Sequence, residues 1–261
     1  MRVRLPVILI CVVGLVSVAT ACDEFREFPE FRYTSALPGG GWGVTPDGIP
    51  GFDGAMQITV PVAYTPHRGL IVGGSSASYD ATPVLSTGGG DANGTAVIGL
   101  GFGKSGHGLY FAEMPTSRDY EPAQNVQQQI LPEGRRQPAV AVGLQDIFEN
   151  RSRYLGAPKD LHNTDSPYVV ATRQFRAAER PLYVTLGLGW GRFNSTAIGG
   201  VSWRASEKLT VMAEYDGFNP NAGLAYDLSD VIAEDTILFG ALVDLNRAVI
   251  GLHYVYKDLP L

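Results

Sequence analysis

Large apolar side chains at every second position constrain the fold of this chain more than any other feature of its sequence. In "PLYVTLGLGWGRFNS", residues 181–195, leucine, valine and tryptophan alternate with glycine, threonine and tyrosine. Successive side chains of a β-strand point to opposite faces, so this segment would have one apolar face and one face of mostly small residues. A soluble sandwich normally carries charge on its outer face, whereas small residues can also line the lumen of a barrel. This strand alone is compatible with both folds.

The alternation recurs from residue 55 onward, and we expect the apolar faces to form one outward band. The strong segments begin near Met56, Ala96, Val140, Leu209, Ala222, Ile237 and Ala248. Weaker segments lie at 68–76, 105–113, 167–175 and 195–203, and longer irregular stretches lie at 77–94, 114–137, 149–165 and 229–234. The segments are about 8 to 11 residues long, the length of a tilted strand that crosses a bilayer. We therefore predict an all-β fold, an antiparallel transmembrane β-barrel of about twelve strands, with a soluble periplasmic sandwich as the rival.

The first 22 residues, "MRVRLPVILICVVGLVSVATAC", have the order of a secretory signal peptide. Two arginines precede an apolar run from Leu5 to Val18, and small residues follow at 19–21. We expect cleavage after residue 21, which leaves Cys22 at the start of the mature chain. The same stretch resembles a bacterial lipobox, which prefers leucine where Ala19 stands. Acylation of Cys22 and plain cleavage are therefore both open, with Cys22 as the lipidation candidate.

This pattern divides the chain into three parts: a signal peptide (1–21), an N-terminal tether or plug segment (22–54) and a β-barrel domain (55–261). The middle part is first acidic and aromatic and then rich in glycine and proline, without sustained periodicity. No other stretch approaches the roughly 18 consecutive apolar residues that a spanning helix needs. If the mature chain enters a membrane, it must do so as a closed barrel, because only helices and barrels satisfy every backbone group in lipid.

The composition excludes several classes of protein. Charged residues make up 18% of the chain, and 32 glycines and 17 prolines suit many short strands and turns better than a helical enzyme. The formal net charge is −6, and loss of Arg2 and Arg4 with the signal peptide would bring it to about −8, which disfavours nucleic acid as a partner. The signal peptide also contains Cys11, so the mature chain would have one cysteine and no internal disulfide.

The sequence shows no catalytic or metal-binding constellation, and we expect no enzyme activity, no metal and no cofactor. The four histidines are scattered, "GLGFGKSGHG" lacks the spacing of a phosphate loop, and there is no G-x-S-x-G motif. The candidate site is instead the polar face of the barrel, which we expect to line the lumen. Its residues are Gln145, Arg173, Arg192, Lys208, Glu214, Asp216, Asn221 and Asp227. Charges inside a small barrel must pair or meet water, so this set forms either a structural network or a lumen that contacts glycan or conducts.

From about residue 138 the chain resembles a known family. The runs "QPAVAVGLQDIFEN", "SPYVVATRQF", "LYVTLGLGWGRFNS", "VSWRASEKLTVMAEYDG" and "FNPNAGLAYDLSD" follow one another much as in the YjbH-like family of bacterial exopolysaccharide-biosynthesis proteins. The resemblance covers roughly residues 135–230. It implies an outer-membrane β-barrel, described in some members as a lipoprotein, that accompanies secretion of an extracellular polysaccharide.

Pattern and resemblance together predict a non-enzymatic protein of the bacterial outer membrane that assists export or surface organisation of a polysaccharide. The expected partners are outer-membrane lipid, the polysaccharide and other proteins of the export machinery. About twelve strands leave a narrow, partly filled lumen, smaller than that of a porin with sixteen or more strands, which favours an accessory or gated role. Two alternatives stay open: a small structural or passive-pore barrel, and an outer-membrane enzyme that acts on lipid or glycan.

Overall fold

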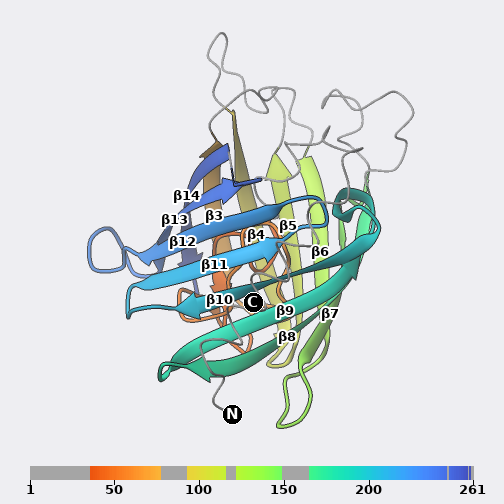
Figure 1. The fold of residues 1–261 in the computed structure, drawn as a ribbon, viewed down its shortest axis with the longest axis horizontal. Coiled ribbons are helices and arrows are strands. Elements are labelled where there is room, and N and C mark those ends of the chain that lie inside the picture. The colour runs from red at the N-terminus through yellow and green to blue at the C-terminus, as the bar shows by residue number, and fades with distance from the viewer. Residues whose placement is uncertain are drawn as a thin grey trace.

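The fold is a closed barrel of antiparallel strands around a buried segment (Figure 1). The computed structural model describes residues 36–77, 93–115, 122–148, 165–245, 247–257 and 259. Within these residues the barrel strands are β3 (Leu70–Ala77), β4 (Asn93–Lys104), β5 (His107–Pro115), β6 (Pro122–Leu131), β7 (Ala139–Gln145), β8 (Ser166–Ala177), β9 (Arg180–Gly189), β10 (Thr196–Arg204), β11 (Leu209–Tyr215), β12 (Pro220–Asp227), β13 (Thr236–Val243) and β14 (Arg247–Tyr256). The predicted signal peptide at 1–21 and Cys22 lie outside the described residues.

Each barrel strand pairs antiparallel with the next one along the chain, and β14 pairs with β3 to close the ring. Two further strands, β1 (Gly43–Val44) and β2 (Pro50–Gly51), form a separate pair, and η4 (Gly191–Phe193) is a short 3₁₀ helix. The prediction of an all-β, antiparallel barrel of about twelve strands is therefore confirmed. Among the described residues, no helix is long and apolar enough to cross a membrane.

The two ends of the barrel carry different connections. β3 begins and β14 ends at the same end, which we call the proximal end. Because consecutive strands alternate in direction, the proximal end also carries the links 105–106, 132–138, 178–179, 205–208 and 228–235. The links 190–195 and 216–219 lie at the opposite end, which we call the distal end.

Residues 36–69, which we call the plug, lie inside the barrel (orange in Figure 1). The plug contributes fully buried large side chains to the core, namely Trp42, Met56, Ile58, Val60, Val62 and Tyr64. Trp42 packs against Tyr110 of β5 with the ring centroids 5.4 Å apart. Tyr64 packs edge-on against Tyr183 of β9 with the centroids 6.0 Å apart. The plug therefore joins separate parts of the barrel wall into one hydrophobic core.

The plug includes a stretch that the alternation predicts as a strand, residues 56–64. This stretch forms no barrel strand: the chain bends at 58–60, and its apolar side chains are buried inside the ring. Conversely, β6 is found within 114–137, where the sequence predicts an irregular stretch. The expected count of about twelve agrees with the observed twelve strands because these two differences offset each other.

The two faces of most strands follow the predicted alternation. In β9, Thr185 is fully buried on the inner side, whereas Leu186 and Leu188 are 61% and 50% exposed. The prediction is wrong for β13, whose apolar residues 237, 239, 241 and 243 are buried rather than outward. The reason is the plug: a Cβ on Gly41 would lie 2.6 Å from the ring of Phe239, so the two segments are in direct contact.

Candidate functional site

One side of the plug is held to the barrel wall by a buried carboxylate, that of Glu214 in β11. Its Oε2 accepts hydrogen bonds from the backbone N–H groups of Ile58 and Val60, at 2.7 and 3.2 Å. Its Oε1 accepts from the backbone N–H and the hydroxyl of Thr59, at 2.8 and 2.7 Å. Three consecutive N–H groups can reach one carboxylate because the chain bends here; in a strand they would alternate in direction. Hydrogen bonds to an ionised acceptor are the strong ones, so Glu214 is a major attachment of the plug.

Two other predicted lumen residues meet Glu214 at the distal end. Asn221 of β12 donates through Nδ2 to Glu214 at 3.1 Å and to Asp216 at 3.0 Å. The second Asp216 oxygen accepts from the backbone N–H groups of residues 218 and 219, at 2.9 and 2.8 Å. Glu214, Asp216 and Asn221 thus form one connected network that fixes both the plug and the 216–219 turn.

A row of amides on β6 holds the other side of the plug. Gln127 donates through Nε2 to the carbonyl of Val62 at 2.9 Å and to the hydroxyl of Thr65 at 2.6 Å. Gln129 accepts from the backbone N–H of Thr65 at 3.1 Å. Neither glutamine is among the residues predicted from the sequence. The usable signal was the polar alternation of "NVQQQ", in which residues 125, 127 and 129 share a face.

The remaining candidates lie near the barrel ends. At the distal end, Arg192 donates to Gln145 at 2.7 Å, and its guanidinium lies 5.1 Å from the centroid of the Phe193 ring. At the proximal end, Lys208 pairs with the Asp230 carboxylate. This hydrogen bond raises the pKa of the Lys208 ammonium group. Asp227 accepts the backbone N–H of residue 229 at 2.9 Å, so Lys208 and Asp227 belong to the rim and not to the plug contacts.

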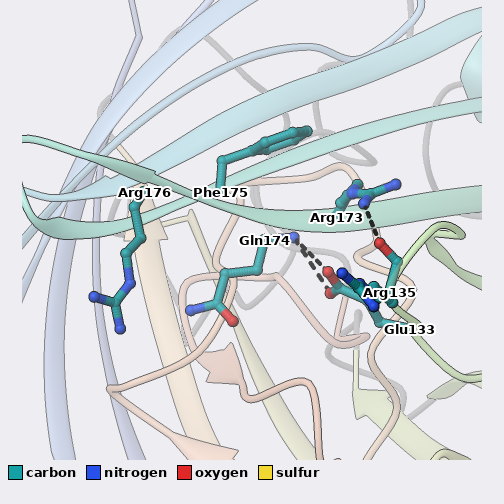
Figure 2. Close-up of a pocket in the computed structure, with 6 residues that line it drawn as sticks. All are labelled: Glu133, Arg135, Arg173, Gln174, Phe175 and Arg176. Atoms are coloured by element: carbon teal, nitrogen blue, oxygen red, sulfur yellow. Dashed lines mark hydrogen bonds between the residues drawn. The ribbon is translucent and has the colours of Figure 1, made fainter. Parts of the chain in front are cut away.

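Arg173 alternates to the outer side of β8, because its neighbour Thr172 points inward and binds the plug backbone N–H of Ala63 at 2.8 Å. Its guanidinium lies 5.8 Å from the centroid of the Phe175 ring, two residues along the same face. Arg173 is therefore on the outer side of the wall and not in the lumen, where the sequence led us to expect it. Arg173 instead lines a cavity at the proximal end (Figure 2).

The cavity forms where β8 extends beyond its neighbour. β7 begins at Ala139, opposite Thr172, so the following residues of β8 have no partner on that side. In place of a neighbouring strand, the Glu133 carboxylate of the 132–138 link accepts a hydrogen bond from the backbone N–H of Gln174 at 3.3 Å. Glu133 also accepts a hydrogen bond from the hydroxyl of the plug residue Tyr64. Burial and this carboxylate raise the pKa of the Tyr64 hydroxyl above its usual range.

Three arginines dominate this cavity, which we call the arginine cavity. Its volume is about 500 Å³, and it is lined by Glu133, Arg135, Arg173, Gln174, Phe175 and Arg176. Figure 2 shows Arg135 and Arg173 beside Glu133, with Arg176 at the opposite side of the Gln174 side chain. Arg173 donates to the carbonyl of Arg135 at 3.0 Å. Within the described residues, the exposed guanidinium groups of Arg135 and Arg176 make no hydrogen bond or ion pair.

This arrangement of charged side chains suits binding of an anion. Three guanidinium groups present planar sets of N–H donors, and one carboxylate opposes them. In the part of the chain that the structure describes, no group of three or more His, Cys, Asp or Glu residues could hold a metal ion.

Comparison with known proteins supplies one match. Residues 114–198 match the model of the YjbH family, described as "Exopolysaccharide biosynthesis protein YbjH". The matched range contains β6 to β9 and all six residues of the arginine cavity, whereas the plug and Glu214 lie outside it. No curated protein matches the chain. The family match associates the chain with exopolysaccharide biosynthesis.

Proposed function

We propose that this protein is a non-enzymatic β-barrel of the bacterial outer membrane that assists export or surface organisation of an extracellular polysaccharide. The observation that carries the proposal is the match of residues 114–198 to a family of exopolysaccharide biosynthesis proteins. The matched range provides four complete strands of the closed barrel. The partners of the protein would be outer-membrane lipid, the polysaccharide and other proteins of the export machinery.

The outer surface of the barrel supports a place in the membrane. Large apolar side chains are exposed on it, including Ile98 at 55%, Leu224 at 51% and Ile250 at 59%. An apolar hollow of about 710 Å³ runs over β11 to β14. Exposed apolar surface of this kind is unfavourable in water and is typical of the lipid-facing side of a barrel. Heat-modifiable migration of the membrane fraction in gel electrophoresis tests this, and quantitative recovery in the soluble periplasm would contradict it.

The filled interior favours an accessory role over free diffusion. The plug bonds to β6, β8 and β11 and packs on β5, β9 and β13, so it occupies the lumen of the described barrel. The same observation favours a second candidate, a small structural barrel without a role in transport. A passive pore would require the plug to leave.

Deletion of the gene decides between the two candidates. We expect loss of secreted polysaccharide while outer-membrane integrity, measured by dye and detergent sensitivity, is unchanged, and full recovery when the gene is supplied in trans. Unchanged polysaccharide under conditions that induce its production would refute the proposed function. Loss of membrane integrity with normal polysaccharide would instead support the structural barrel.

A further inference from the structure

We propose that the arginine cavity binds carboxylate groups of an acidic polysaccharide, an inference that rests on the proposed function. A guanidinium group is planar and can donate two parallel hydrogen bonds to one carboxylate. Three such groups line the cavity: Arg135 and Arg173 lie beside Glu133, and Arg176 lies on the far side of the Gln174 side chain. The one carboxylate among them, Glu133, already accepts hydrogen bonds from Tyr64 and Gln174. The arginines therefore keep a surplus of positive charge for an external anion.

The size and exposure of the cavity suit sugar units of a longer chain. Its volume of about 500 Å³ lies within the range of roughly 300 to 1,000 Å³ that is typical of small-molecule sites. Arg135 and Arg176 are exposed, so a chain can contact them while its flanking units stay in solvent. Phe175, which is partly exposed, adds an apolar ring next to Arg173 on which the face of a sugar can pack.

The position of the cavity is what favours a polysaccharide as the anion. Outer-membrane barrels place their short turns on the periplasmic side, and the two-residue links 105–106 and 178–179 lie at the proximal end. The arginine cavity lies at this same end, so it would face the compartment from which a newly made polysaccharide arrives. The chain as a whole has a net charge of −6, which makes this local positive charge a feature of the site and not of the whole surface.

The test is a binding measurement on the purified full chain in a zwitterionic detergent at low salt. The probes are oligogalacturonate, the uncharged maltohexaose, inorganic phosphate, and micelles that contain phosphatidylglycerol. The variant Arg173→Gln/Arg176→Gln removes two guanidinium groups from the cavity. The control Arg68→Gln/Arg136→Gln removes the same charge from two exposed side chains at the proximal end that do not line the cavity.

We expect oligogalacturonate to bind the natural protein and the control alike, and to bind the cavity variant at least about tenfold more weakly. Maltohexaose should bind none of them. Because Arg173 also donates to the carbonyl of Arg135, Arg176→Gln alone is the second variant; its side chain has no partner among the described residues, and it should weaken binding by about three- to tenfold.

Three results would overturn the proposal: equal binding of the neutral and acidic sugars, equal weakening by the control, or arginine-dependent binding of phosphate or lipid micelles without binding of oligogalacturonate. The last result would assign the cavity to a phosphate group. None of these results bears on the deletion phenotype. Loss of polysaccharide in the deletion strain that is fully restored by the cavity variant would leave the proposed function standing and remove this site from it.

Discussion

The replacement Glu214→Gln tests whether the buried carboxylate is what holds the plug. Glutamine keeps the size and one acceptor oxygen but presents an NH₂ group where Oε2 accepts the N–H groups of Ile58 and Val60. A buried donor left without an acceptor costs about 1 to 3 kcal/mol, and the remaining bonds lose their charge assistance. We therefore expect the free energy of plug opening to fall by about 3 kcal/mol, which is more than a 100-fold change in the opening equilibrium.

Amide hydrogen exchange followed by mass spectrometry measures this opening directly. Peptides that cover residues 55–64 should exchange more than 100-fold faster in Glu214→Gln, whereas peptides from β8 should change little because the barrel itself stays closed. The matched control is Glu207→Gln, an exposed glutamate in the 205–208 turn. Unchanged exchange of the plug in Glu214→Gln would show that its packing, and not this carboxylate, determines its attachment.

Three further changes test the outer face, the inner wall and the N-terminus. Leu186→Arg, at a position 61% exposed on the outside, should lower barrel stability in lipid vesicles by about 2 to 4 kcal/mol in urea unfolding, and no change would argue against lipid contact. Gly251→Val should lower the free energy of barrel unfolding by about 1 to 3 kcal/mol, because a Cβ there would lie 2.0 Å from the Phe239 ring. Gly240→Ala, where the nearest atom is 3.8 Å away, should leave this free energy nearly unchanged in the same urea unfolding assay. If Cys22 is acylated, Cys22→Ala should abolish labelling by a fatty-acid analogue, whereas an unchanged mass after the substitution, apart from the side chain itself, would argue for plain cleavage.

The sequence predicts the barrel well because most of its strands are amphipathic. In β14, for example, Ile250 and Leu252 face outward while His253 is buried, as the alternation requires. β6 escapes the same analysis because "PAQNVQQQIL" has few apolar residues on either face. Its inner glutamines are tolerated in the interior because they bond to the plug backbone, and that partner cannot be inferred from the strand alone.

The candidate site could be predicted from the sequence only in part, because the binding partners of its residues lie on distant segments of the chain. Glu214, Asp216 and Asn221 could be assigned to the inner face from their spacing, and the structure brings them together. What Glu214 binds could not be foreseen, since its partners at 58–60 lie more than 150 residues away in the sequence. The arginine cavity was missed because it depends on the overhang of β8 past β7, which is a matter of strand register.

The apolar inner wall limits how the barrel can take part in transport. Ejecting the plug would expose Trp42, Met56, Ile58, Val60 and Val62, all fully buried, together with the inner side chains of β13. At about 1.5 to 3 kcal/mol for each large side chain, the five plug residues alone amount to roughly 10 kcal/mol. That is comparable to the whole stability of a typical domain, about 5 to 15 kcal/mol. Complete release by thermal motion is therefore too rare to serve as a gate, and contacts with a polysaccharide are expected at the barrel ends, where the arginine cavity lies, and not along the lumen.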